Sequence, residues 1–277
     1  MEKDQDGNYS SKELTKFCEH IWNTDENALF AGEDYELDLQ GRTRYSKGGE
    51  DKAEDPLFTR VDKKALEKPT FKAFIALLDN YVSETGVAEV VTNEERKENK
   101  NFVDLVFETT VMKDAHKFLV EQGKADKDVN TFKREFHDMW FKMYKREYGI
   151  RGEDSSGFEH VFVGETRKDE VIGFHNWIHF YLEEKRGNID YMGFMASDRN
   201  PNFLTVQFAW KKDVKPKGSM FVGVSPEFEI ALYTVCFLLG HESYLIELNG
   251  EPVMIKAYKT KGRIGTTFAQ NPPYHRK

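Results

Sequence analysis

The sequence predicts an α+β protein, with a mainly helical region (residues 1–149) followed by a region of antiparallel sheet and helices (residues 150–277). Before Gly149, apolar residues recur every three to four positions, which is typical of helices with one buried face. After Gly149, short runs of β-branched and aromatic residues predominate, which indicates strands. The 277 residues are 39% hydrophobic, so the chain can bury a sizeable core.

Helices dominate the first region. The first helix follows the N-cap sequence Ser10-Ser-Lys-Glu-Leu14, and its predicted buried face consists of Leu14, Phe17, Cys18 and Ile21. A polar, glycine-rich loop covers residues 32–50. Another helix opens at Lys68-Pro-Thr-Phe71, and its buried stripe consists of Phe71, Phe74, Ile75 and Leu78. Further helical patterns cover Thr92–Phe107, Val111–Gln122 and Thr131–Tyr148.

Strands and two helices make up the second region. The predicted strands are Phe158–Val163, Asp190–Ala196, Leu204–Trp210, Met220–Val224, Ser243–Leu248 and Val253–Tyr258. Asn249-Gly250 separates the last two strands and predicts a tight hairpin. One helix covers Gly173–Glu184. The other begins at Ser225-Pro-Glu-Phe, with serine as N-cap and proline at the first helical position.

Charge is unevenly distributed along the chain, whose net charge is −8. Residues 211–277 carry ten Lys and Arg against six Asp and Glu, so this end is basic while the remainder is acidic. A locally basic site on an acidic protein suits a small phosphate footprint better than a long nucleic-acid track. Scattered surface charge is the alternative interpretation.

The two cysteines, Cys18 and Cys236, provide neither a disulfide framework nor a cysteine-type zinc site. A single long-range bridge between them remains open. The N-terminal residues are polar, and we recognise neither a signal peptide nor a membrane span. We therefore expect a cytoplasmic protein, or a secreted one if a leader was removed.

Two histidines and a lysine are the candidate catalytic residues. His160 and His175 lie among apolar and aromatic residues, and a lysine-rich loop, Lys211–Ser219, follows. Two imidazoles can cleave RNA without a metal, because one accepts the 2′-OH proton and the other protonates the leaving 5′-oxygen. A cation such as Lys215 would stabilise the phosphorane. We place His175 in the first turn of its helix, where the helix dipole lowers the imidazole pKa.

Other interpretations of these residues stay open. His160 is consistent with a structural histidine at the start of a strand. His175-x-x-x-His179 has the spacing of a metal pair but lacks the glutamate of zinc proteases. Asp25-Glu26 and Glu33-Asp34 are possible Ca²⁺ or Mn²⁺ ligands, but they lack EF-hand spacing and are also consistent with a solvated surface.

Long motifs throughout the chain resemble the EndoU family of poly(U)-specific endoribonucleases, whose catalytic domain is related to the coronaviral uridylate-specific endoribonuclease. The motifs of the second region are Gly157-Phe-Glu-His160-Val-Phe-Val-Gly-Glu165, Gly173-Phe-His175-Asn-Trp-Ile, Lys215-Pro-Lys-Gly-Ser219, Phe221-Val-Gly-Val-Ser225-Pro-Glu-Phe and Ile264-Gly-Thr266-Thr. Those of the first region are Asp34-Tyr-Glu-Leu-Asp-Leu-Gln-Gly41 and Leu77-Leu-Asp-Asn-Tyr81. The resemblance thus covers nearly the whole chain.

The resemblance implies a role for each matching residue. His175 would be the general base, His160 the general acid, and Lys215 the phosphorane-stabilising cation. Ser219 would favour uracil. The supporting positions would be Glu159, Glu165 and Thr266. The products would carry a 2′,3′-cyclic phosphate and a 5′-hydroxyl.

The resemblance also implies a metal cofactor and a substrate. Mn²⁺ is the expected cofactor and Ca²⁺ the alternative, with ligands that the sequence does not identify. The expected partner is single-stranded RNA that contains uridine, bound by a monomer that is not attached to a membrane.

One position departs from the family pattern. Phe268 in Thr266-Thr-Phe268 stands where the family has a tyrosine that stacks on the nucleoside. A phenylalanine keeps the stacking face and loses the hydroxyl. We therefore expect cleavage to persist, with altered affinity or a weaker preference for uridine.

Three functions compete at this point. An endoribonuclease is the leading hypothesis, and an RNA-binding module with weak or lost cleavage is the second. A metal-dependent hydrolase centred on His175 and His179 is the third. The His160, His175 and Lys215 set favours the nuclease, because binding alone does not need two titratable imidazoles.

Overall fold

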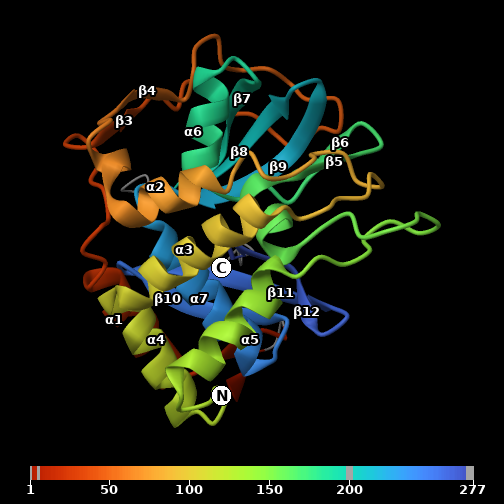
Figure 1. Cartoon of the computed structure of the whole chain (residues 1–277). Helices are drawn as coiled ribbons and strands as arrows, with labels where there is room; N and C mark the ends of the chain where they lie inside the picture. Colours follow the sequence, from red (N-terminus) through yellow and green to blue (C-terminus); the bar gives the residue numbers. More distant parts are fainter. Residues whose placement is uncertain (1, 5–6, 198–201, 273–277) are drawn as a thin grey trace.

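The computed structural model describes residues 2–4, 7–197 and 202–272 (Figure 1). Two five-stranded sheets and a hairpin are combined with helices. The helices are α1 (Lys12–Asn23), α2 (Pro69–Ala76), α3 (Asn93–Glu108), α4 (Thr110–Glu121), α5 (Val129–Phe141), α6 (Trp177–Lys185) and α7 (Pro226–Leu239), together with a short 3₁₀ turn, Ala65–Glu67. Within the described ranges, none of these helices is both long and apolar enough to cross a membrane.

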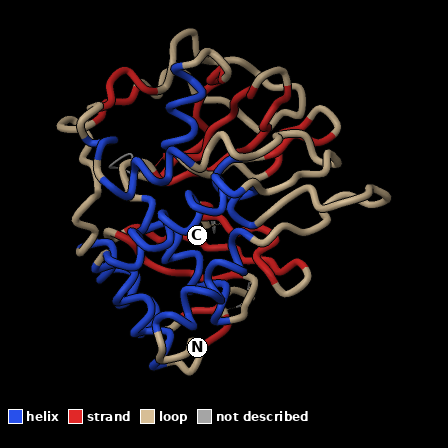
Figure 2. Tube along the Cα trace, in the orientation of Figure 1, coloured by secondary structure: helices blue, strands red, loops and turns tan. Residues whose placement is uncertain are grey.

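One sheet has the strand order β1-β2-β10-β11-β12 and joins the two ends of the chain. Its strands are β1 (Glu2–Lys3), β2 (Tyr9–Ser10), β10 (Ser243–Leu248), β11 (Glu251–Thr260) and β12 (Arg263–Gln270). In Figures 1 and 2 this sheet lies with α1, α3, α4, α5 and α7 in the lower part of the molecule. The strands β10, β11 and β12 form consecutive antiparallel pairs.

The second sheet has the order β5-β6-β9-β8-β7. Its strands are β5 (Glu165–Arg167), β6 (Glu170–Ile172), β7 (Ile189–Ser197), β8 (Phe203–Trp210) and β9 (Asp213–Phe221). Helix α6 packs along it at the top of Figure 1. In Figure 1 the hairpin of β3 (Tyr35–Leu37) and β4 (Phe58–Val61) lies to the left of α6, whose Glu184 carboxylate accepts the Leu57 and Phe58 N–H groups.

Several local predictions are confirmed. The Ser11 hydroxyl accepts the Leu14 N–H at 3.0 Å, and all four residues of the predicted α1 face are buried. The Ser225 hydroxyl caps α7 by accepting the Phe228 N–H at 3.1 Å. Asn249 and Gly250 both have positive φ, 52° and 76°, as a tight hairpin of this hand requires.

Other predictions were wrong. The expected strand Phe158–Val163 is a wide helical turn, Glu159–Val163, in which every residue is buried. A run that is buried on all sides lacks the periodicity that distinguishes strand from helix. The lysine-rich loop Lys211–Ser219 belongs mostly to strand β9, and the predicted strand Met220–Val224 contains only the last two residues of β9.

Element boundaries account for further differences. Helix α5 ends at Phe141, before Tyr148, and α6 begins at Trp177, after Gly173. The structure also contains β1 to β6 and β12, which the sequence did not suggest. Cys18 and Cys236 are free and buried, so the long-range bridge does not form.

The division into residues 1–149 and 150–277 stays a prediction. Strands β1 and β2, from the start of the chain, join a sheet formed by its last three strands. Arg276 and Lys277, which contribute to the predicted basic end, lie outside the described residues.

Candidate active site

A pocket of about 460 Å³ lies where the two sheets meet. Strand β9 of one sheet and strand β12 of the other approach each other there, and the Ser219 hydroxyl donates to the Ala269 carbonyl. The pocket brings together six residues that the sequence singled out: His160, His175, Lys215, Ser219, Thr266 and Phe268.

The segments that carry the two histidines are joined by main-chain hydrogen bonds. The Phe174 N–H donates to the His160 carbonyl at 3.0 Å, and the His175 N–H donates to the Val161 carbonyl at 2.7 Å. Gly173 has a φ of +64°, and a β-carbon there would lie 1.7 Å from the His160 carbonyl oxygen. Only glycine therefore allows the two segments to come this close.

His160 is anchored through one ring nitrogen. Its Nδ1 hydrogen-bonds a carboxylate oxygen of Glu165, and the Arg146 guanidinium lies 3.1 Å from the same oxygen. Burial lowers the His160 pKa to about 4, although the Glu165 carboxylate raises it. The pKa of Glu165 lies below its usual value, because the attraction of His160 and Arg146 outweighs burial. Glu165 therefore stays ionised behind the imidazole.

His175 is also anchored through Nδ1, in this case on a neutral acceptor. The Ser219 carbonyl lies 2.9 Å from Nδ1, and a carbonyl can only accept, so Nδ1 carries the proton and Nε2 keeps its lone pair. Burial lowers the pKa of His175 well below its usual value, and the charge of Lys215 lowers it further. The predicted direction is correct, but its predicted cause is not. His175 precedes the N-cap residue Asn176, so it lies outside the first turn of α6.

Phe268 stacks on the imidazole of His175. The ring centroids are 4.8 Å apart and the planes are inclined by 10°. The phenyl ring is half-buried and borders the pocket. One face of Phe268 thus helps to orient His175.

Lys215 supplies the buried cation of the pocket. Its side chain projects from β9, and the residue is 8% exposed. Burial lowers the Lys215 pKa to about 8, while Glu170 raises it. Its ammonium is therefore mostly charged at neutral pH.

Glu159 lies in the helical turn beside His160 but outside the pocket lining. It is fully buried, and one carboxylate oxygen accepts the Ser156 N–H at 3.2 Å. Burial raises its pKa well above the usual value, and the neighbouring Glu165 and Glu89 raise it further. Glu159 is thus a neutral, hydrogen-bonding carboxyl close to the ionised Glu165.

Arg146 and Glu89 lie beside Glu165 and Glu159, respectively, but were not identified from the sequence. Arg146 lies in Lys145-Arg-Glu147, which resembles an ordinary solvated charge run. Its role depends on Glu165, which is distant in sequence, so no local pattern reveals it. Lys217 and Thr266 border the pocket as well.

His179 does not share the pocket with His175. Its ring packs against Phe174 and Trp210, with centroids 4.8 Å and 5.9 Å away. Across the described ranges, no group of three or more His, Cys, Asp or Glu side chains is arranged to hold a metal ion. The metal pair considered from the sequence is therefore not supported.

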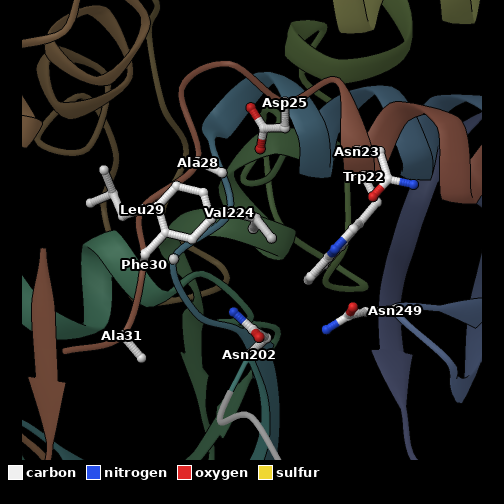
Figure 3. Close-up of a pocket in the computed structure, with 11 residues that line it drawn as sticks. Trp22, Asn23, Asp25, Ala28, Leu29, Phe30, Ala31, Asn202, Val224 and Asn249 are labelled. Atoms are coloured by element: carbon white, nitrogen blue, oxygen red, sulfur yellow. The ribbon is translucent and has the colours of Figure 1, made fainter. Parts of the chain in front are cut away.

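A second cavity, of about 400 Å³, lies away from these residues (Figure 3). Trp22 and Phe30 face it from opposite sides, with Val224 between them. Asn202, Asn249 and Asp25 border it. The described residues that line it include no histidine and no lysine, so this cavity lacks the residue types of the candidate catalytic set.

Comparisons with known proteins agree with this geometry. The model of the family "Endoribonuclease XendoU" matches residues 13–269. Poly(U)-specific endoribonuclease-B of Xenopus laevis is 50% identical over 275 residues, covering 92% of each chain. Uridylate-specific endoribonuclease B of Danio rerio is 46% identical over 269 residues, covering 93% of this chain and 95% of the relative.

A solved structure of XendoU, described as a splicing-independent snoRNA-processing endoribonuclease, superimposes with a TM-score of 0.82. The two sequences are 44% identical, and the match covers 94% of this chain and 97% of that one.

Proposed function

Because the chain belongs to the endoribonuclease XendoU family, we propose that it cleaves single-stranded RNA at uridylates. The 2′-oxygen attacks the adjacent phosphorus and the bond to the 5′-oxygen breaks. The products carry a 2′,3′-cyclic phosphate and a 5′-hydroxyl. The reaction consumes no water at this step, and one proton moves from the 2′-OH to the leaving oxygen.

The observation that carries this proposal is the matched anchoring of two imidazoles in one pocket. Both His160 and His175 are held through Nδ1, so each Nε2 remains for the substrate. Only the acceptors differ: a carboxylate behind His160 and a carbonyl behind His175. A carboxylate stabilises an imidazolium, whereas a carbonyl fixes the neutral tautomer.

His175 is the general base in this mechanism. Its lowered pKa keeps it neutral at physiological pH, and Nε2 accepts the 2′-OH proton. The stack on Phe268 and the Ser219 carbonyl hold the ring in place during the transfer.

His160 is the general acid. In the free protein its pKa is about 4, and an RNA phosphate beside Nε2 would favour the imidazolium and raise that pKa. Glu165 acts in the same direction from Nδ1, and Arg146 holds Glu165 in place. Glu159 and Thr266 have supporting roles, Glu159 by fixing the helical turn through Ser156.

Lys215 stabilises the charge that builds up on the phosphorane. A buried ammonium acts more strongly on a nearby anion than a solvated one, because little water screens it. Its pKa of about 8 keeps this charge at neutral pH.

Ser219 discriminates uracil from cytosine. Its hydroxyl proton is donated to the Ala269 carbonyl, so its lone pairs face the pocket as acceptors. Uracil N3 carries a proton that such an acceptor can bind, whereas cytosine N3 carries none. The free face of Phe268 is available for stacking on the base.

We further propose a monomeric enzyme that Mn²⁺ stimulates, with Ca²⁺ as the alternative ion. The described side chains do not form a cluster that fits either ion, so every step above is assigned to the chain's own residues. An ion would then act by shaping the RNA or the site.

Cleavage of a short fluorescent RNA with a single uridine tests the proposal, in Mn²⁺, Ca²⁺ or EDTA. We expect a cyclic-phosphate product at the uridine, and none from His175→Ala. RNA that is bound but uncleaved under every condition would favour the alternative, an RNA-binding module with weak or lost activity.

A further inference from the structure

A basic and aromatic cavity lies outside the catalytic pocket. It measures about 640 Å³ and is lined by Arg42, Thr43, Arg44, Tyr45 and Met195. Arg42, Arg44 and Tyr45 are exposed, and Tyr45 is 60% accessible to solvent. An exposed tyrosine that shares a cavity with two exposed arginines has no role in the core, which points to a ligand.

The segment that carries these residues is fixed to the second sheet by main-chain hydrogen bonds to Phe194 of β7 and by one buried side chain. Gln207 of β8 is fully buried, and its Nε2 donates to the carbonyls of Arg44 and Ser46 at 3.3 Å and 3.2 Å. Its Oε1 accepts the Glu50 N–H at 2.8 Å. The segment is therefore held in one conformation before any ligand binds.

The same glutamine connects this segment to the catalytic strand. Its Nε2 also lies 3.2 Å from the carbonyl of Pro216, the residue between Lys215 and Lys217. Lys217 is exposed and borders the catalytic pocket. Figure 1 shows the long loop between β3 and β4 passing beside β7, β8 and β9. One side chain thus bridges the main chains of Arg44 and Pro216, which places the Arg44 segment next to the strand that carries Lys217.

The charge of the cavity suits an anion. Glu50 is a nearby carboxylate whose charge attracts Arg44, but Lys52 is its ion-pair partner, at 2.7 Å. The side-chain hydrogen bond that the structure gives Arg42 joins its Nε to the Met195 carbonyl at 3.3 Å. No carboxylate of the described residues forms an ion pair with Arg42 or Arg44. Both guanidinium groups can therefore bind phosphate oxygens.

We propose that this cavity is a second RNA subsite, which binds the nucleotides that flank the cleaved uridylate. Arg42 and Arg44 contact backbone phosphates, and Tyr45 stacks on a base. Guanidinium groups and an aromatic face together are the recurring means of holding single-stranded RNA without reading its sequence. This inference rests on the proposed endoribonuclease function.

The test compares two substrates: a uridylyl dinucleotide, which fills only the catalytic pocket, and an RNA of about twelve nucleotides with a single uridine. We expect R42Q/R44Q to lower kcat/KM on the longer RNA about tenfold at low salt, and to leave the dinucleotide unchanged. For R42Q/R44Q, the negative slope of log(kcat/KM) against log[salt] becomes shallower by about 1.4, or 0.7 for each lost phosphate contact. Tyr45→Ala lowers kcat/KM on the longer RNA about fivefold, and Tyr45→Phe restores it.

The matched control is R96Q/R134Q, which removes two exposed arginines from α3 and α5. It has the same net charge as R42Q/R44Q, so a loss that depends only on net charge would appear in both. Equal rates for R42Q/R44Q and wild type on the longer RNA would overturn the subsite. An equal loss on the dinucleotide would overturn it too, because the effect would then act through the catalytic pocket.

The same experiments distinguish a failure of the proposed function from a failure of the subsite. If wild type cleaves neither substrate, the proposed function fails. The subsite is then judged by the Kd of a fluorescent RNA of the same length, which must still rise in R42Q/R44Q and stay unchanged in R96Q/R134Q.

Discussion

The catalytic pocket and the Arg42–Tyr45 cavity would both bind RNA, but the pocket is built from buried side chains and the cavity from exposed ones. In the pocket, His160, His175 and Lys215 are buried, and their pKa values are lowered by burial. In the cavity, Arg42, Arg44 and Tyr45 are exposed to solvent. Proton transfer needs groups whose pKa the protein controls, whereas phosphate binding needs only charge that the RNA can reach. The difference predicts which variants change the rate and which change binding.

The largest effect is expected from His160→Ala, which removes the proposed general acid and nothing from the cavity. We expect kcat to fall by about 10² to 10⁴-fold while the Kd for a flanked RNA changes little. Single-turnover cleavage and fluorescence anisotropy measure the two quantities. A matched loss of affinity would mean that His160 is a structural residue.

Glu165→Gln tests how the pocket tunes its acid. The Glu165 carboxylate raises the His160 pKa, so its neutralisation lowers that pKa and leaves less imidazolium at a given pH. We expect kcat to fall about tenfold or more at neutral pH, with the alkaline limb of the pH–rate profile displaced to lower pH. A uniformly lower profile with an unmoved limb would contradict this role.

Ser219→Ala should change selectivity more than rate. The Ser219 carbonyl that holds His175 is part of the main chain and survives the substitution. We expect the ratio of kcat/KM for uridine over cytidine to fall about tenfold at most, as befits one hydrogen bond. Competition between RNAs that differ only at the cleaved base measures the ratio. An unchanged ratio would remove Ser219 from base recognition.

Phe268→Tyr is the mildest change, because the stacking face on His175 is kept. We expect cleavage to persist, with KM or the uridine preference altered severalfold. Steady-state kinetics on the same pair of RNAs provides the comparison. Identical rate and preference would show that the missing hydroxyl has no consequence in this protein.

Local chemistry predicted those parts of the fold that depend on neighbouring residues. The Ser225-Pro cap and the Asn249-Gly250 turn need no tertiary information, and both are present. The turn Glu159–Val163 was mistaken for a strand because its side chains are buried in every direction. The strand character of Lys215 and Lys217 was hidden, because lysines in a strand next to a pocket resemble lysines in a loop.

In the candidate site, too, some residues were predictable from the sequence and others were not. His160, His175, Lys215, Ser219 and Phe268 belong to motifs that the resemblance identifies, and they meet in one pocket. Arg146 depends on a distant carboxylate, so its own neighbours carry no signal. The place of residues 42–45 depends on Gln207, one of two polar residues in strand β8, and on main-chain bonds to Phe194 of β7. Such connections are properties of the folded chain alone.

The close approach of the His160 and His175 segments at Gly173 affects which substitutions this protein can tolerate. Two main-chain hydrogen bonds and a missing β-carbon hold the His160 and His175 segments together. The spacing of the two histidine segments is thus set mainly by the backbone. Substitutions in the aromatic core should therefore lower the melting temperature well before they misalign proton transfer, and the catalytic geometry can persist while the sequence around it drifts.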